Sequence, residues 1–567
     1  MAPSTATPSY SQFTCIGAGV SGIGLGATLQ RWYGITDIQI FERHEGCGGT
    51  WFANRYPGVA CDVPSALYSF SFETNPNWTR VLPTQEELLK YVTRVARKYD
   101  LLKRMRFRCS VQRAEWIEES ARWRLTVHDD ATDTTFVHET QFLFSGTGQL
   151  VTPRELDVPG AETFRGPIFH SARWNHDVDL TDKRVIVIGN GCTGNQIVPN
   201  IVDKTKHTTH LVRSKHWVMH PIDASVPPWL RTLFKAPGAM TLQRFIVFFM
   251  AELSLQGFPM TAYAQLFRNR QRAVAERYMR SHAPAKWHDK LIPDFEVGCK
   301  RRIFDSGYLE CLNRDNITLT DERALDVVPE GIRTASGLIE ADVIVLANGF
   351  VTNNYFGGID IVGRGGVTMQ EHWASFGGAE AYNCTSMSGF PNFFCMQGPN
   401  SATGHTSGIM AIENAINYGL RVLRPCIEGR ASVADVKLKA EEEYVEGLQR
   451  DLQKTVWFSG CQSWYVQDAA AGGKRWNAMS YPYSQAHFWY RCLFPKWADW
   501  EYSGRVTRKN KPSKILRTIL LAGAIVAGGV AWNLKSGATP EQMVSTLTGS
   551  LQSLRSLVLS HISAVSK

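Results

Sequence analysis

The alternation of apolar and polar residues along the chain predicts two strand–turn–helix–strand units of the same design. The first has an apolar strand at 13–16, a glycine-rich turn, a helix and a strand at 38–41. The second has a strand at 184–188, a glycine-rich turn, a helix and a strand at 210–212. Each unit spans about 30 residues, as a β-α-β unit of a parallel, doubly wound sheet requires. The pattern therefore predicts an α/β protein.

The segments around these units predict further elements of the same kind. Thr84 and Glu87 have the spacing of a capping box and predict the start of a helix. An alternating strand is predicted around 123–127, a buried strand at 343–346 and a helix at about 408–423.

Residues from about 219 to 324 lack this alternation and are typical of helices. Their most apolar stretch, 245–250, is too short to span a bilayer. It therefore predicts a buried core helix within a helical insertion.

The charge of the chain is concentrated at one end. Of 567 residues, 44% are hydrophobic and 20% charged, which excludes a mostly disordered or fibrous protein. The formal net charge is +9. Residues 503–567 contain many Lys and Arg but a single acid, Glu541, so nearly all of the excess lies there. The rest of the chain is close to neutral, and no nucleic-acid partner is predicted.

The C-terminal tail has the composition of a membrane segment. Residues 519–532 form an uninterrupted apolar and Gly/Ala run, extendable to about 518–534, which is near the lower limit of about 17 residues for a spanning helix. Six cations precede them, as on a cytosolic flank: Arg505, Arg508, Lys509, Lys511, Lys514 and Arg517. A helix packed on the body is an equal alternative. Residues 1–12 lack the pattern of a secretory signal, so we expect a cytosol-facing protein, anchored to a membrane if 518–534 inserts.

The twelve cysteines are scattered along the chain. None forms a C-x-x-C pair, and no His/Cys cluster has zinc spacing, so neither a redox dithiol nor a metal site is predicted. We expect reduced, mostly buried thiols.

Each glycine-rich turn has the context of a dinucleotide-binding motif, because a strand precedes it and a helix follows. The first contains Gly17, Gly19 and Gly22, and Glu42 follows at the distance of a residue that binds ribose hydroxyls. The second covers 189–194, and Arg213 follows at the same distance, which suits the 2′-phosphate of NADPH. The pair predicts FAD at the first turn and NADPH at the second. Disulfide reductases, dehydrogenases and monooxygenases all use such a pair, and the missing dithiol argues against reductases.

Two further segments are similar to the fingerprints of type I Baeyer–Villiger monooxygenases. Residues 48–62 match the first fingerprint at every defined position. The second is matched by Phe164, Gly166, His170 and Trp174, with Ser171 where Thr is usual. The resemblance covers about 13–502 and is strongest to fungal enzymes of secondary metabolism.

This resemblance implies two Rossmann-like domains and an oxidoreductase that uses NADPH and O2 to insert oxygen beside a ketone carbonyl. The product is an ester or lactone, and the reaction passes through a flavin C4a-peroxide. The implied domains are an FAD-binding domain (1–150 and 380–502), an NADPH-binding domain (151–218 and 325–379), the helical insertion (219–324), and the basic tail with its apolar and amphipathic helices (503–567).

The resemblance also implies roles for single residues. The catalytic cation is Arg301, in the segment 298–301, and Asp62 pairs with it. FAD contacts are implied for Gly17, Gly19, Gly22, Glu42, Thr50, Trp51, Phe52, Ala53, Asp62, Tyr68 and Val111. NADP contacts are implied for Ala60, Cys61, Asp62, Asn190, Gly191, Cys192, Thr193, Gly194, Asn195, Gln196, Arg213, Ser214, Lys300 and, on a mobile covering loop, Trp464. His170 and Trp174 would couple motions of the domains.

Two other functions stay open at this point. A nitrogen- or sulfur-oxidising flavin monooxygenase shares the nucleotide motifs, and a membrane-anchored, non-catalytic nucleotide-binding scaffold is the alternative of another class. The sequence indicates neither which small-molecule ketone is the substrate nor the oligomeric state.

Overall fold

The structure is a computed structural model, and it describes residues 8–352, 355–467 and 475–504. Residues up to Ile427 together with Ser432–Gly504 form one compact unit, which contains every element named below. A second unit consists of Glu428–Ala431 and Arg505–Lys567.

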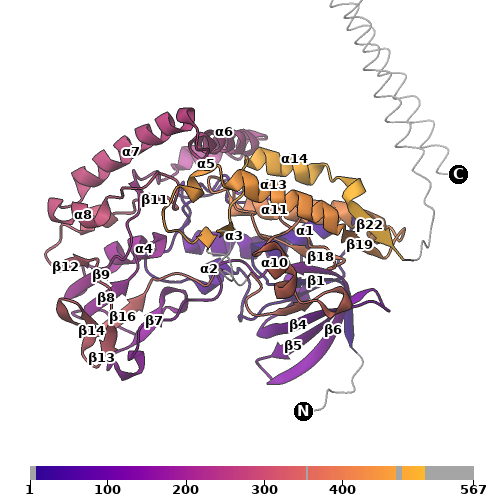
Figure 1. Cartoon of the computed structure of the whole chain (residues 1–567), viewed down its shortest axis with the longest axis horizontal. Helices are drawn as coiled ribbons and strands as arrows, with labels where there is room; N and C mark the ends of the chain where they lie inside the picture. The colour runs from indigo at the N-terminus through magenta and orange to yellow at the C-terminus, as the bar shows by residue number, and fades with distance from the viewer. Residues whose placement is uncertain (1–7, 353–354, 468–474, 505–567) are drawn as a thin grey trace, which may run out of the picture. The chain divides into compact units, whose positions relative to one another are not determined.

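In the larger sheet β1 lies between β6 and β2 (Figure 1). The strand order is β17-β4-β5-β6-β1-β2-β3, with β18 also paired with β6. β1 is parallel to both β2 and β6, whereas β4, β5 and β6 form an antiparallel meander. The strands are β1 (Ser9–Ile16), β2 (Ile38–Phe41), β3 (Met105–Arg106), β4 (Cys109–Ile117), β5 (Arg122–Asp129), β6 (Thr134–Ser145), β17 (Asp360–Val362) and β18 (Phe393–Cys395).

Helices cover this sheet, and α1 packs against both α3 and α11. The helices are α1 (Val20–Tyr33), α2 (Thr50–Ala53), α3 (Gln85–Lys98), α10 (Met369–Phe376), α11 (Gly408–Val422), α12 (Arg424–Ile427), α13 (Leu438–Leu452) and α14 (Gln485–Leu493). The predicted cap of α3 is confirmed, because the Thr84 hydroxyl accepts the N–H of Glu87. The Glu87 carboxylate instead accepts the N–H of Thr79, so the reciprocal half of the box is missing.

The second sheet is parallel throughout, in the order β12-β9-β8-β16-β7. Its strands are β7 (Ile168–His170), β8 (Arg184–Ile188), β9 (His207–Leu211), β12 (Ile317–Thr320) and β16 (Val343–Leu346), and α4 (Cys192–Ile201) and α9 (Tyr308–Cys311) accompany it. The α/β class is confirmed by these two sheets. The helical prediction for 219–324 missed β12, because a strand of four residues shows its partner only in the folded sheet.

Smaller sheets complete the unit. β10 (Val218–Met219) pairs with β11 (Ile303–Phe304), and β13 (Asp326–Val328), β14 (Gly331–Thr334) and β15 (Gly337–Glu340) form an antiparallel meander. β19 (Val433–Val436) pairs with β22 (Trp500–Ser503), and β20 (Val466–Gln467) pairs with β21 (Trp476–Asn477).

The helical segment consists of α5 (Pro228–Leu233), α6 (Ala239–Leu253), α7 (Ala262–His282) and α8 (His288–Leu291). The prediction of a buried core helix at 245–250 is wrong. Within α6, Phe245 is 64% exposed and Phe249 57% exposed. An apolar helix is buried only where another element packs against its apolar side chains. Among the described residues, no element packs against the outer face of α6.

None of the helices in the described ranges is long and apolar enough to cross a membrane. The predicted membrane segment, 518–534, lies outside the described residues.

A buried ionic group joins α10 to α13. Nε2 of His372 lies 3.2 Å from a carboxylate oxygen of Glu380 and 3.2 Å from one of Glu441, and both glutamates are fully buried. Burial opposes a charge on His372, but hydrogen bonds and attraction from the two carboxylates outweigh it and raise its pKa to about 9. The imidazole is therefore a cation that compensates buried negative charge.

Candidate functional site

The first glycine turn connects β1 to α1 and leaves no room for side chains. Gly17 has φ +104°, and a Cβ on it would lie 2.5 Å from the carbonyl oxygen of Gly146. A Cβ on Gly22 would lie 2.3 Å from the carbonyl oxygen of Gly17. The cap residue of α1, Gly19, has no side chain to bond the first N–H groups of the helix. A helix N-terminus of this kind is an anion-binding site and fits a pyrophosphate.

Glu42, just after β2, is held beside this turn. Its carboxylate accepts the N–H of Ala18 at 2.8 Å and that of His44 at 2.9 Å, and the residue is buried. The remaining lone pairs of a fixed carboxylate suit donors such as ribose hydroxyls.

The first fingerprint, residues 48–62, includes the short helix α2, which consists of Thr50, Trp51, Phe52 and Ala53. A Cβ on Gly49, the cap of α2, would lie 2.9 Å from Cα of Gly19, so the two glycine segments touch. The rings of Trp51 and Tyr68 pack edge to face, with their centres 5.6 Å apart. Val111 is buried on β4 opposite Val127, and this strand begins at Cys109, whose N–H donates to the carbonyl of Glu42 at 2.9 Å.

The second glycine turn connects β8 to α4 in the same way. A Cβ on Gly194 would lie 2.1 Å from the carbonyl oxygen of Gly189, whereas the space beside Gly191 is open. α4 starts at Cys192 and Thr193 without a side-chain cap. The Asn195 amide donates to the carbonyls of Asn190 and Gly191 and fixes the turn.

Contacts between the first fingerprint and α4 join the two turn regions. The Tyr56 hydroxyl donates to Oε1 of Gln196 at 2.8 Å, and Nε2 of Gln196 donates to the carbonyl of Ala60 at 3.0 Å. Tyr56 and Ala60 of the first fingerprint therefore lie against α4, the helix that follows the second glycine turn.

Arg301 and Asp62 form a paired ion bridge at this junction. Nε and Nη2 of Arg301 donate to the two carboxylate oxygens of Asp62, each at 2.7 Å. The charge of Asp62 raises the pKa of Arg301 well above its ordinary value, so the guanidinium is permanently charged. Burial raises the pKa of Cys192 to about 11, and the pKa of buried Cys61 is raised too, so both thiols beside the pair stay neutral.

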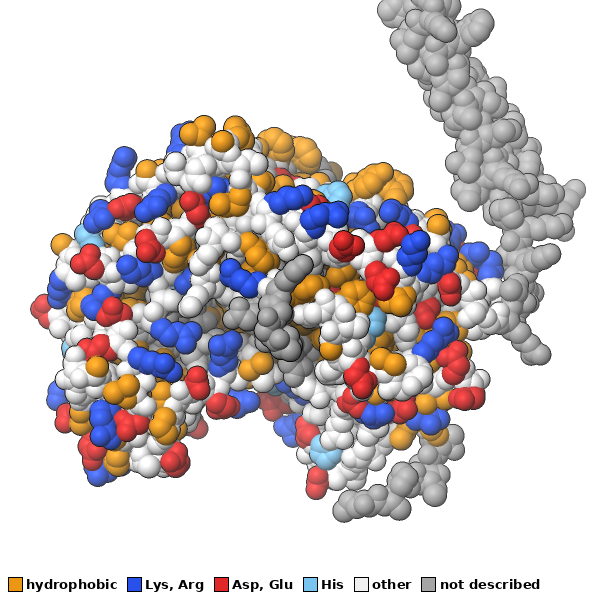
Figure 2. Space-filling model, viewed as in Figure 1, with side chains coloured by type: hydrophobic (Ala, Val, Ile, Leu, Met, Phe, Trp, Pro, Cys, Tyr) orange, Lys and Arg blue, Asp and Glu red, His pale blue; other side chains and the backbone are white. Residues whose placement is uncertain are grey.

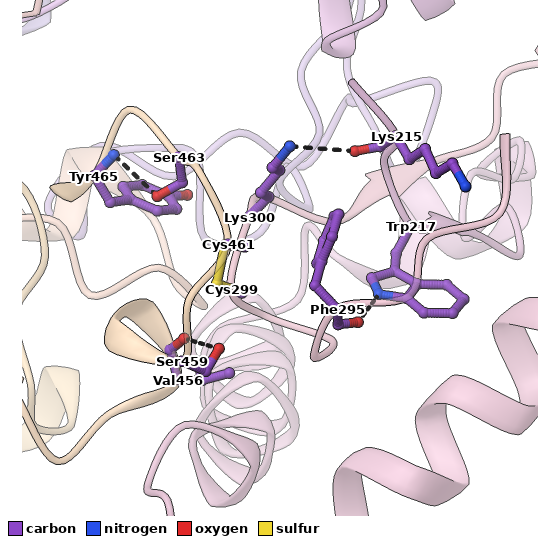
Figure 3. Close-up of a disulfide and its surroundings, with 10 residues drawn as sticks. All are labelled: Lys215, Trp217, Phe295, Cys299, Lys300, Val456, Ser459, Cys461, Ser463 and Tyr465. Carbon is purple, nitrogen blue, oxygen red and sulfur yellow. Dashed lines mark hydrogen bonds between the residues drawn. A yellow bond between two sulfur atoms is a disulfide. The ribbon is translucent and has the colours of Figure 1, made fainter. Parts of the chain in front are cut away.

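Lys300 lies on the other side of the same segment, with its Nζ 4.8 Å from the ring centre of Phe295. Nζ donates to the carbonyl of Lys215 at 3.5 Å (Figure 3). Burial, together with repulsion from the exposed Arg213, lowers the pKa of Lys300. Two cations that repel each other, with Ser214 beside Arg213 in the chain, suit a phosphate between them.

A disulfide between Cys299 and Cys461 links the Arg301 segment to an aromatic segment (Figure 3). The expectation of reduced thiols is wrong for this pair. No pattern in the sequence indicated it, because the two cysteines are 162 residues apart. Cys15, Cys61, Cys192 and Cys311 are among the cysteines that remain thiols.

The aromatic segment beyond Cys461 contains Trp464 and Tyr465, whose ring centres are 4.6 Å apart. Trp464 is 37% exposed, whereas Tyr465 is buried. Burial raises the pKa of Tyr465 while attraction from Arg301 lowers it, and the rise prevails. Tyr465 is therefore a neutral phenol facing the guanidinium, a neighbour that the sequence analysis did not assign.

The second fingerprint lies along the edge of the second sheet, not beside Arg301. His170 ends β7 and its Nε2 donates to the carbonyl of Gly349 at 3.0 Å, because its Nδ1 accepts the N–H of Ala172. A Cβ on Gly166 would lie 2.1 Å from the carbonyl oxygen of Asp342. Trp174 packs edge to face on Phe169, and Phe164 packs on the core of this sheet.

The residues thus fit two dinucleotides, since each turn has an uncapped helix N-terminus, a glycine approach and a matching carboxylate or cation pair. The chemistry of the Arg301 junction is that of a site where negative charge develops.

Comparisons with known proteins agree with this geometry. The model of the family described as "Flavin-binding monooxygenase-like" matches residues 11–255. A Baeyer–Villiger monooxygenase of Streptomyces coelicolor is 36% identical over 484 residues, 83% of this chain and 89% of the relative. The FAD-binding monooxygenase ktnD of Aspergillus niger is 32% identical over 92% of this chain and 88% of its own length.

Solved structures are similar over most of the chain. A steroid monooxygenase bound to NADP has a TM-score of 0.75 at 26% identity, covering 87% of this chain and 100% of its own. The complex of OTEMO with FAD and NADP has a TM-score of 0.74 at 25% identity, covering 88% and 100%. The chain belongs to the Baeyer–Villiger monooxygenases and is an FAD-containing, NADPH-dependent oxidoreductase that catalyses flavin-dependent Baeyer–Villiger oxidation.

Proposed function

We propose that Arg301 is the fixed positive charge of the reaction and that Asp62 holds it in place. The observation that carries this proposal is the pair of 2.7 Å hydrogen bonds at the junction of the two turn regions. Attack on a ketone carbonyl creates a negative oxygen, and a preoriented guanidinium stabilises that charge without reorganisation. Arg suits this role better than Lys because its charge is permanent and its planar fork matches a carboxylate.

We infer the following division of cofactors. The turn at Gly17–Gly22 with Glu42 would hold FAD, and the turn at 189–194 with Arg213 and Lys300 would hold NADPH. When bound, NADPH supplies a hydride and FAD activates O2 toward the ketone. The chain's own residues bind and orient both cofactors and supply the positive charge.

The finer organisation is proposed on the same basis. The larger sheet would be the core of the FAD-binding domain (1–150 and 380–502) and the second sheet that of the NADPH-binding domain (151–218 and 325–379), with 219–324 as an insertion. Tyr68 and Trp464 would line the two cofactors, and His170 and Trp174 would transmit motion between domains.

The substrate we propose is a small-molecule ketone of secondary metabolism. Similarity to the fungal FAD-binding monooxygenases of Aspergillus niger and Aspergillus terreus supports this class. A nitrogen- or sulfur-oxidising activity is disfavoured by the Arg301–Asp62 pair. Product analysis with a cyclic ketone and a thioether separates the two, since an ester or lactone identifies the first activity and a sulfoxide the second.

We also propose that residues 503–567 attach the enzyme to a membrane. Six cations followed by an apolar run support this, at about 1 kcal/mol per cation near an anionic leaflet. A chain that ends at Gly504 should then bind membranes more weakly than the full-length enzyme and keep its activity. Membrane binding of that shortened chain as strong as that of the full-length enzyme would contradict the role of the tail.

The experiment that tests the catalytic proposal uses Arg301→Ala with NADPH, O2 and a panel of ketones. We expect NADPH still to reduce the flavin, while ester formation falls below detection. The matched control is Arg314→Ala, which breaks an exposed pair with Asp203 that has an Nε–Oδ1 distance of 3.1 Å. A normal ester yield from Arg301→Ala would exclude the assigned role.

A further inference from the structure

The helix α6 turns an apolar stripe toward solvent. Its exposed large residues are spaced by three or four positions, so they lie on one face. They are Leu242, Phe245, Ile246, Phe249, Met250 and Leu253, each between 37% and 64% exposed. In a helix of a globular protein such a stripe normally faces the core. Here the opposite face of α6 is the one that packs, with Met240 buried.

Neighbouring elements extend this stripe into a surface. Trp229 and Leu233 on α5 and Tyr263 and Leu266 on α7 are each at least 54% exposed. Figure 2 shows hydrophobic side chains gathered over this region and over α14. We call the exposed apolar residues of α5, α6, the start of α7 and α14 the apolar face.

A half-buried carboxylate joins α14 to α6. Glu252, near the end of α6, accepts the N–H of Gln485 at 3.0 Å, at the start of α14. The same carboxylate bonds Nε2 of His405 at 2.8 Å. α14 contributes exposed aromatic residues to the face, namely Trp489, Tyr490 and Phe494.

The charges around the face favour an anionic partner. From Ala224 to Ala251 the chain has no acidic residue, and it has three cations, Arg231, Lys235 and Arg244. Arg244 is committed to the carbonyls of Ala66 and Ser69. Of the other two cations, Lys235 is exposed and Arg231 is half-buried. The carboxylate of Glu252 points inward to α14, so it adds no negative charge to the face.

We propose that the apolar face docks onto the surface of a lipid bilayer that contains anionic headgroups. An exposed helix with Phe, Ile, Leu and Trp on one side and Lys or Arg nearby is the signature of a helix that lies in the membrane interface. The backbone N–H and C=O groups in the middle of α6 are bonded within the helix, so these groups need no partner in the acyl region.

The composition of the chain beyond the described residues supports lipid over a protein partner. Gly504, the last described residue, follows exposed Trp497 closely, and the next residues hold six cations and then an apolar run. A partner protein would have to match the face with groups of its own. A bilayer needs no such match.

The proposal does not rest on the assigned catalytic roles, and it concerns residues of the described unit. The test uses the full-length holoenzyme, flotation with vesicles of phosphatidylcholine and phosphatidylserine, and the double variant Phe245→Glu/Phe249→Glu. We expect its apparent affinity for vesicles to fall roughly tenfold or more, because two charges replace rings that enter the interface. Both proteins keep the tail, so the difference reports on the face.

The matched control is Leu325→Glu/Leu338→Glu, which adds equal charge at residues 53% and 47% exposed beside the small antiparallel sheet. It should bind vesicles like the wild type, and Trp489→Glu/Phe494→Glu should weaken binding from a different helix. Full FAD occupancy in each variant shows that the fold is intact.

Three results would overturn the proposal. One is equal binding by Phe245→Glu/Phe249→Glu and its control, which would leave all attachment to the tail. Another is a wild-type protein that does not float with these vesicles. The third is a wild-type dimer in sedimentation equilibrium that this variant converts to a monomer, because a second copy would then cover the face.

Discussion

The guanidinium of Arg301 and the carboxylate of Asp62 meet in two hydrogen bonds of 2.7 Å, although 239 residues separate them in the chain. Asp62 ends the first fingerprint, and Arg301 follows the disulfide-bonded Cys299 by two positions. The direction of the fork is thus set by two segments that are each held by other contacts. A charge fixed in this way needs no rearrangement when negative charge develops beside it.

Asp62→Asn should lower kcat by about 10- to 100-fold, because the amide keeps the shape of the side chain but loses the charge that orients Arg301. Reduction of the flavin by NADPH should change much less. Stopped-flow reduction and product yield measure the two effects separately. Asp203→Asn, which disrupts the exposed pair with Arg314, is the control, and a wild-type kcat in Asp62→Asn would refute the orienting role.

Lys300→Met should weaken the preference for NADPH over NADH by about 10- to 100-fold, since it removes one of two cations suited to the 2′-phosphate. The ratio of kcat/KM for the two nucleotides is the measurement. Lys206→Gln, an exposed lysine next to β9, should leave that ratio unchanged. An unaltered ratio in Lys300→Met would place the phosphate elsewhere.

Gly22→Ala should abolish FAD binding, because the new Cβ would lie 2.3 Å from a backbone oxygen of the turn. The absorbance ratio of flavin to protein after purification reports occupancy. Gly447→Ala, inside α13, is the matched control, since its Cβ meets only the tip of Arg450 at 3.6 Å. Ala there should raise helix stability by up to about 1 kcal/mol. Normal flavin content in Gly22→Ala would contradict the close packing of the first turn.

Reduction of the Cys299–Cys461 disulfide should destabilise the protein by about 2–5 kcal/mol, because the bond closes a long loop in the unfolded chain. Thermal melts with and without dithiothreitol measure this in the wild type. The double variant Cys299→Ser/Cys461→Ser should have the melting temperature of the reduced wild type, and dithiothreitol should not change that temperature. Cys311→Ser, which removes a free thiol, should keep the response. Equal melts of wild type with and without reductant would show that the bond adds no stability.

The fold should lose stability at alkaline pH, because His372 then loses the proton that gives it its stabilising charge. Its pKa in the fold is raised to about 9, above the ordinary value of 6.5. Its contribution is therefore fully present below about pH 6.5 and is lost as the pH rises through 9. The melting temperature of the wild type should fall more between pH 7 and 10 than that of His372→Gln. Parallel curves for the two proteins would show that His372 carries no such charge.

The pattern of apolar and polar residues predicted those elements that are encoded by residues adjacent in the chain. The strands at 38–41, 184–188 and 343–346 are observed with the same bounds, because buried parallel strands are short apolar runs between turns. The cap at Thr84 was recognisable for the same reason. Features that depend on distant partners were missed, among them β12 and the Cys299–Cys461 bond. The exposed face of α6 was misjudged because apolar composition does not say what lies against it.

The residues of the candidate site also separate into those with a local sequence signal and those brought together by folding. Motif spacing indicated Glu42, and the family resemblance implied Asp62 and Arg301, whose chemistry is carried by the residue type itself. It gave no sign of Tyr465 facing Arg301, since that neighbour is brought in from the far end of the chain by folding. Assignments such as Val111, which the structure buries within the larger sheet, followed from resemblance alone.

The strands of the larger sheet are synthesised at widely separated times. β17 pairs with β4 and β18 with β6, yet residues 146–359 are translated between those partners. At roughly 5–20 residues per second, a ribosome needs on the order of ten to forty seconds for that stretch. During that wait the nascent meander presents an unpaired strand edge, the kind of surface on which chains stick to one another. Yield in a foreign host should therefore depend on chaperones that bind early, before residue 360 emerges.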